Sequence, residues 1–142
     1  MTLLYSHNNA RPEPLPFRIR FINGSTRTDS STFTQEELTA AGYTGPFTEP
    51  SYDAKTEVLD WDGENYFVRP YNTQELEDQW NKVREQRNQL LKDSDWTQIS
   101  DYDLGLENKE QWATYRQELR DLPEVQSNPF DISYPDIPEL SL

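Results

Sequence analysis

Residues 80–98 read WNKVREQRNQLLKDSDWTQ, and residues 112–123 read WATYRQELRDLP. Both stretches begin with tryptophan and repeat apolar residues at the spacing that brings side chains onto one face of a helix. The first face comprises Trp80, Val83, Arg87 and Leu90 with Leu91 beside it, and the second comprises Trp112, Tyr115, Leu119 and Leu122. The pattern predicts one helix from residue 73 to about 92 and another from about 107 to 122. A connecting loop of roughly fifteen residues makes them an antiparallel pair.

Arginines beside these faces have two interpretations. Arginine holds carboxylates and carbonyls bidentately, so it suits a clamp inside the helix pair, with Asp95 as the favoured partner, or a contact with another protein. Trp96 in the loop presents the same choice. The helix-pair residues assigned to partner binding are Arg84, Arg87, Trp96 and Arg116. The residues assigned to the structural core are Trp61, Trp80, Val83, Leu90, Trp112, Tyr115 and Leu119.

A longer string of residues runs through both helices and their loop. Its members are Trp80, Arg84, Arg87, Asn88, Leu90, Leu91, Ser94 to Gln98, Trp112 to Gln117 and Leu119 to Pro123. This string resembles the C-terminal signature of bacteriophage tail assembly chaperones, which are also called tail fibre assembly proteins. Residues 42–46 and the stretch ending near Val68 resemble the N-terminal half of that family. The chain departs from the family pattern in two places: 100–106 lacks prolines, and Tyr134-Pro135 stands where Trp-Pro is usual.

Composition suggests small cores and an interaction surface. The 142 residues suit one domain or two small ones. Only 33% are hydrophobic and the mean hydropathy is -1.00, whereas 13% are aromatic, which is too many for a disordered chain. Aromatic residues are enriched at protein interfaces. The chain has no cysteine, which excludes disulfides, thiol nucleophiles and cysteine zinc sites.

The charge is strongly acidic and unevenly distributed. The formal net charge is -13, yet residues 1–28 hold four arginines and one glutamate. An acidic chain repels phosphate backbones, so no nucleic-acid partner is expected. The basic segment suits an acidic surface, its own or a partner's. No signal pattern or long apolar run is present, so we expect no membrane association and a location in the cytoplasm.

The N-terminal half predicts two hairpins and a short helix. Residues 1–16 read as an extended arm because alternating prolines remove backbone donors. Phe17 to Ile22 alternates as a strand, and Asn23-Gly24 predicts a type I′ turn into a short strand over 25–28. Thr34 and Glu37 form a capping box for a helix over about 35–41, with Gly42 as its C-terminal cap. A loop is expected over 43–52.

The second hairpin is predicted over 57–61 and 66–69, around the turn dipeptide Asp62-Gly63. Asn72 or Thr73 then caps the first long helix, and Pro123 ends the second. Residues 124–142 alternate prolines with apolar residues, which suits an extended tail laid along a surface. We expect this tail and the N-terminal arm over 1–16 to be ordered by other chains, either the fibre protein or copies of this one. The partner-binding residues assigned to the tail are Phe130, Ile132, Tyr134 and Ile137.

Catalytic and metal-binding patterns are weak. His7 is the only histidine and lies in the N-terminal arm. Residues 60–64 read DWDGE, but a calcium-binding EF-hand loop needs its glycine at position six, so a hairpin turn is the better interpretation. Asp101 and Asp103 could hold a cation, although loop acids usually face water. No catalytic residue, cofactor or metal is therefore assigned, and an accessory enzyme is the remotest function class.

The sequence predicts an α+β protein with four parts. These are an extended arm over 1–16, a small β-rich domain over 17–72, a helical hairpin over 73–123 and an extended tail over 124–142. The resemblance implies a non-enzymatic phage protein that binds a tail fibre or receptor-binding protein and covers its apolar or edge-strand surface during assembly. The alternative is a permanent component of the virion fibre or baseplate. The chain could also form a homo-oligomer, with a trimer matching a trimeric fibre.

Overall fold

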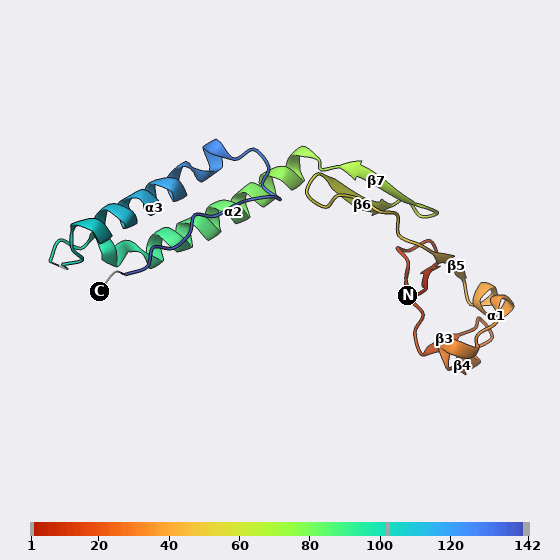
Figure 1. Ribbon diagram of the computed structural model, residues 1–142. Coiled ribbons are helices and arrows are strands. Elements are labelled where there is room, and N and C mark those ends of the chain that lie inside the picture. Colours follow the sequence, from red (N-terminus) through yellow and green to blue (C-terminus); the bar gives the residue numbers. More distant parts are fainter. Residues whose placement is uncertain (1, 102, 141–142) are drawn as a thin grey trace. The chain divides into compact units, whose positions relative to one another are not determined.

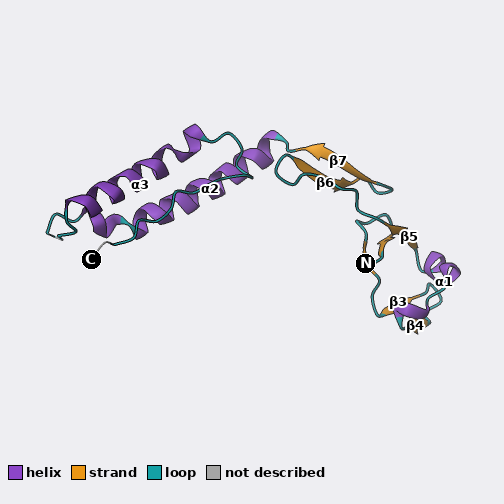
Figure 2. Ribbon diagram, viewed as in Figure 1, coloured by secondary structure: helices purple, strands orange, loops and turns teal. Residues whose placement is uncertain are grey.

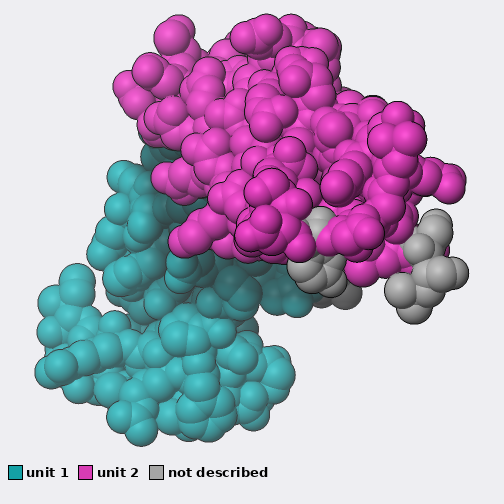
Figure 3. Space-filling model, turned by 90° about the vertical axis from the view of Figure 1, so that its left-hand side faces the viewer, with its two compact units in different colours: residues 1–52, 58–69 teal, residues 53–57, 70–142 magenta. Residues whose placement is uncertain are grey.

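The computed structural model describes residues 2–101 and 103–140 and forms two compact units. Unit 1 consists of the residues up to Tyr52 together with Val58–Arg69, and unit 2 consists of Asp53–Glu57 together with the residues from Pro70 onward (Figure 3). Figure 2 shows strands in unit 1 and long helices in unit 2, so the α+β prediction is confirmed.

A three-stranded antiparallel sheet organises the start of unit 1. Its strands are β1 (Leu4–His7), β2 (Glu13–Pro14) and β5 (Tyr43–Phe47), in the order β2-β1-β5. Leu4 pairs with both Pro14 and Phe47, so strand pairing within this chain, and not another chain, orders the predicted N-terminal arm. The loop predicted over 43–52 is therefore wrong for residues 43–47. Pairing with the distant β1 supplies the backbone hydrogen bonds of β5. The residues around Gly45-Pro46 show no local sequence pattern that predicts this pairing.

The predicted first hairpin is present, with a different turn. Strands β3 (Arg18–Arg20) and β4 (Thr26–Thr28) pair antiparallel, and Ile19 is buried beneath them. A type I′ turn requires positive φ at both central residues. In this turn Gly24 has φ 85° and Asn23 does not have positive φ. The Asn23 side chain instead accepts hydrogen bonds from the backbone N–H and the hydroxyl of Ser25.

The short helix has the predicted ends. Helix α1 (Gln35–Ala40) follows a short 3-10 turn, η1 (Ser30–Thr32). The Glu37 N–H donates to the Thr34 hydroxyl at 3.2 Å, and the Thr34 N–H donates to the Glu37 carboxylate at 3.0 Å. Gly42 adopts φ 86° immediately afterwards. The capping box and the left-handed glycine are both confirmed.

The second hairpin comprises β6 (Glu57–Trp61) and β7 (Tyr66–Pro70), as predicted. Trp61 is half-buried, and it meets the rings of Phe47 and Tyr66 edge-on at centroid distances of 5.0 and 5.1 Å. Its indole N–H donates to the Asn9 carbonyl at 2.8 Å. The predicted core position Trp61 thus joins the hairpin to the N-terminal arm within unit 1.

Unit 2 is built on the helical hairpin of α2 (Thr73–Asp93) and α3 (Leu106–Val125), joined through the 3-10 turn η2 (Asp95–Gln98) (Figure 1). Asn72 caps α2 in a capping box with Glu75, as predicted. Helix α3 does not end at Pro123. Proline lacks one donor but the final turn still closes, because the Gln126 N–H donates to the Leu122 carbonyl at 3.2 Å. None of the described helices is long and apolar enough to cross a membrane.

Candidate partner-binding surface

An aromatic cluster forms the core of the helical hairpin. Its buried members are Leu104, Trp112, Tyr115 and Leu119, and its half-buried members are Leu90, Leu91, Trp96 and Tyr134. Trp112 meets Trp96 and Tyr115 edge-on, with both centroid distances at 5.6 Å. Val83 is also buried, whereas Trp80 is half-buried. Trp96 therefore covers the loop end of the helix pair from within the chain.

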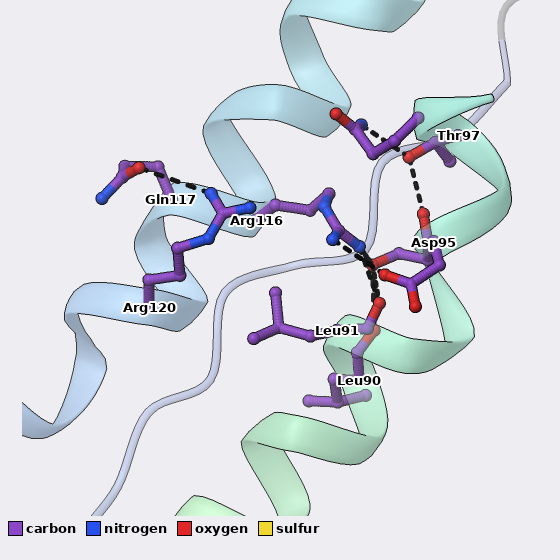
Figure 4. A network of polar contacts seen from close by, with 9 residues as sticks. Leu90, Leu91, Asp95, Thr97, Arg116, Gln117 and Arg120 are labelled. Atoms are coloured by element: carbon purple, nitrogen blue, oxygen red, sulfur yellow. Dashed lines mark hydrogen bonds and ion pairs between the residues drawn. The ribbon is translucent and has the colours of Figure 1, made fainter. Parts of the chain in front are cut away.

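Arg116 ties α3 to the end of α2 and to η2 (Figure 4). One guanidinium nitrogen donates to the Leu91 carbonyl at 2.6 Å and to the Ser94 hydroxyl at 2.7 Å. The other terminal nitrogen donates to the Asp95 carboxylate at 2.9 Å. Arg116 is only 8% exposed, so its charge is held inside the hairpin. This geometry is that of the internal clamp, with Asp95 in the place that sequence reasoning gave it.

The other predicted arginines have looser contacts. Arg84 donates to the Asn81 side chain at 3.3 Å and lies 5.9 Å from the centre of the Trp80 ring. Arg87 donates to the Arg120 carbonyl at 3.4 Å, a second link between the helices. These contacts are exposed, so these side chains have freedom to rearrange against a partner.

The C-terminal segment lies against its own helices (Figure 1). Phe130 stacks on Tyr71 with centroids 3.7 Å apart, and the Pro129 carbonyl accepts a hydrogen bond from Gln79. Tyr134 packs on the aromatic cluster, and burial raises the pKa of its hydroxyl. Contacts within the chain therefore hold this segment, which sequence reasoning assigned to contacts with another chain.

The four tail residues assigned to partner binding separate into two groups. Phe130, Ile132 and Tyr134 are half-buried against unit 2. Ile137 is 63% exposed. Only Ile137 leaves most of its side chain for another molecule.

A groove of about 440 Å³ separates one face of α3 from the end of this segment. The α3 wall consists of Glu107, Glu110, Gln111, Thr114, Tyr115 and Glu118, and the facing wall consists of Asp136, Ile137 and Pro138. Helical periodicity places the α3 residues on one face, as their spacing of three and four shows. That spacing was readable from the sequence, but the facing wall was not.

The residues considered for chemistry do not converge. His7 lies in β1, with its Nε2 3.1 Å from the Ala41 carbonyl and its ring against Tyr43. Asp103 accepts a hydrogen bond from the Gly105 N–H and so shapes the loop. Asp62 accepts the N–H groups of Glu64 and Asn65 in the hairpin turn. Within residues 2–101 and 103–140, no cluster of three His, Cys, Asp or Glu side chains could hold a metal ion.

Residues 80–139 match the family model described as phage tail assembly chaperone protein. This part of the chain is similar to the phage tail assembly chaperone family. The match covers most of α2, the clamp, all of α3 and the groove-forming end of the C-terminal segment. No curated protein and no solved structure matches the chain. This match supports a role in phage tail assembly.

Proposed function

We propose that the chain binds a tail fibre or receptor-binding protein of its phage and assists that protein's folding or attachment without catalysing a reaction. The family match carries the proposal, because it covers the elements that build the hairpin surface. The binding event would take place in the infected host cytoplasm, before or during attachment of the fibre.

Exposed apolar side chains on unit 2 support a binding role. Within the matched segment they are Ile99, Leu106, Val125 and Ile137, each at least 56% exposed. The clamp and the aromatic cluster hold helix α3, which carries Leu106 and Val125, so little order has to be gained there when a partner binds. Such side chains could cover apolar surface on an unassembled fibre chain, which would otherwise aggregate.

Co-purification tests the proposal. The chain is co-expressed with the affinity-tagged tail fibre protein of the same phage, and we expect the two to elute together. Leu106→Ser combined with Ile137→Ser should reduce the recovered chain at least about fivefold, since truncating a central apolar anchor of an interface costs more than about 1 kcal/mol of binding free energy. The matched control is Phe17→Ser with Ile22→Ser, two apolar residues of unit 1 that are also well exposed, at 69% and 101%.

The result that contradicts the proposal is a wild-type chain that does not elute with the fibre protein. An equal loss in the control variant would remove the assignment to the hairpin surface. Mass spectrometry of purified virions then distinguishes a transient helper, which is absent, from a permanent tail component, which is present at fixed stoichiometry.

A further inference from the structure

The groove between α3 and residues 136–138 is acidic on both walls. Glu107, Glu110 and Glu118 line one wall and Asp136 lines the other, while no lysine, arginine or histidine lines either. All four acids are exposed, and none of them has a hydrogen bond or ion pair with the described residues. A concave surface lined by one sign of charge concentrates ligands of the opposite sign. The groove therefore favours a cationic occupant.

Apolar side chains lie between the acids of the groove. Ile137 is 63% exposed, and Pro138 follows it. Tyr115 is only 3% exposed, yet it also lines the groove. A purely charged ligand would leave these groups unused.

The spacing of the acids selects the form of the occupant. Glu110 and Glu118 are eight residues apart on one helix, which is about 12 Å at 1.5 Å per residue. An extended chain advances about 3.3 Å per residue, so side chains four residues apart are separated by about 13 Å and point to the same side. The residue midway between them also points to that side, toward the level of Thr114 and Tyr115.

We propose that this groove binds an extended segment of a phage tail protein that carries two basic side chains four residues apart with an aliphatic side chain midway. The basic groups pair with Glu110 and Glu118, and the aliphatic group contacts Tyr115 and Ile137. This inference rests on the proposed function, because it takes the occupant from the tail protein that the chain binds.

A pair of peptides tests the groove itself. The probe is acetyl-Arg-Gly-Leu-Gly-Arg-amide, and its control is acetyl-Arg-Arg-Leu-Gly-Gly-amide, which has the same composition in the wrong register. Each is titrated into the isotope-labelled full chain and followed by NMR. We expect saturable shifts at Glu110, Thr114, Glu118 and Ile137 with the probe, and binding at least about fivefold weaker with the control peptide. Equal binding of both peptides, or shifts spread over other acidic surfaces, overturns the proposal.

Matched variants assign the charge contacts. Glu110→Gln with Glu118→Gln should weaken probe binding at least tenfold, because two ion pairs lose their charge. Glu77→Gln with Glu85→Gln makes the same charge change at the same spacing on exposed positions of α2 and should leave binding within twofold. Unchanged thermal melting of both variants shows that they fold. An equal effect of the two pairs of substitutions would mean that net charge, not the groove, attracts the peptide.

The same variants in the fibre co-purification separate the two proposals. Loss of fibre recovery in the groove variant alone supports the groove as the contact. Full recovery in that variant overturns the groove proposal and leaves the proposed function standing. A wild-type chain that binds the probe but never the fibre protein overturns the proposed function and, with it, the tail protein as occupant.

Discussion

Removal of the Arg116 guanidinium should destabilise the helical hairpin far more than neutralising its acidic partner. Arg116→Ala deletes three hydrogen bonds, to Leu91, Ser94 and Asp95, from a side chain that is 8% exposed. Hydrogen bonds that involve a charged group contribute about 1.5–3 kcal/mol each. Two features make the expected loss of stability smaller than the sum of three such hydrogen bonds. The Leu91 carbonyl still accepts from Ser94, and the Arg116 Nε has no partner among the described residues.

We therefore expect Arg116→Ala to lower the free energy of unfolding by about 3 kcal/mol, where full additivity would give more. Asp95→Asn should cost less than about 1 kcal/mol, because that carboxylate is 65% exposed and exposed ion pairs contribute little. Arg116→Lys keeps the charge but cannot bridge the same acceptors, so it should fall between the two.

Chemical denaturation of the full chain, followed by tryptophan fluorescence, measures these differences, since Trp96 and Trp112 lie in the hairpin core. Near-ultraviolet circular dichroism reports the same aromatic cluster independently. If Asp95→Asn cost as much as Arg116→Ala, the ion pair rather than the helix-end carbonyl and hydroxyl would hold the clamp. If neither changed stability, the clamp would not stabilise the fold.

Four further outcomes are expected. Trp112→Ala should lower the free energy of unfolding by about 3–5 kcal/mol because it leaves a cavity in the core. Trp112→Phe should lower it clearly less, because the indole N–H has no partner among the described residues. Thermal melts compare the two variants. Thr34→Ala should cost about 1 kcal/mol by removing the α1 cap, and an unchanged melt would refute this. The hydrogen bond from Arg27, together with that from the Thr34 N–H, lowers the pKa of Glu37 below its ordinary 4.5. The ionised Glu37 carboxylate should therefore stabilise the fold above that pH, and this contribution should disappear on acidification. Glu37→Gln should remove that part of the pH dependence from a titration of the free energy of unfolding. Phe130→Ala should cost roughly 2 kcal/mol by removing the ring stacked on Tyr71, and faster amide exchange confined to residues 126–134 would show local release of the C-terminal segment.

Local chemistry made much of the fold predictable. The capping boxes at Thr34 and Asn72 each depend on two residues three positions apart, and both formed as the sequence indicated. The periodic apolar residues of α2 and α3 likewise identified their facing sides, because 3.6-residue periodicity is a local property. The prediction that α3 ends at Pro123 was wrong, because a helix tolerates a missing backbone donor near its last turn.

Non-local pairings were not predictable in the same way. Strand β5 exists because β1, some forty residues earlier, lies beside it. The sequence left open whether Arg116 clamps the helices or contacts another protein, because the answer depends on how closely the ends of α2 and α3 approach. The acidic groove was not predictable because it forms only where Ile137 lies opposite α3, and no sequence periodicity relates these two segments.

The yield of correctly assembled fibre shows whether this chain assists the assembly of the tail fibre protein. The tail fibre protein of the same phage is expressed in bacteria alone and together with this chain, and the soluble, protease-resistant, native oligomer is quantified at equal expression. We expect a several-fold rise in that oligomer with the chain present, and a smaller rise with the Leu106→Ser, Ile137→Ser variant. If the yield of oligomer were the same with and without the chain, and the chain were absent from the purified oligomer, the proposed role in fibre assembly would be contradicted.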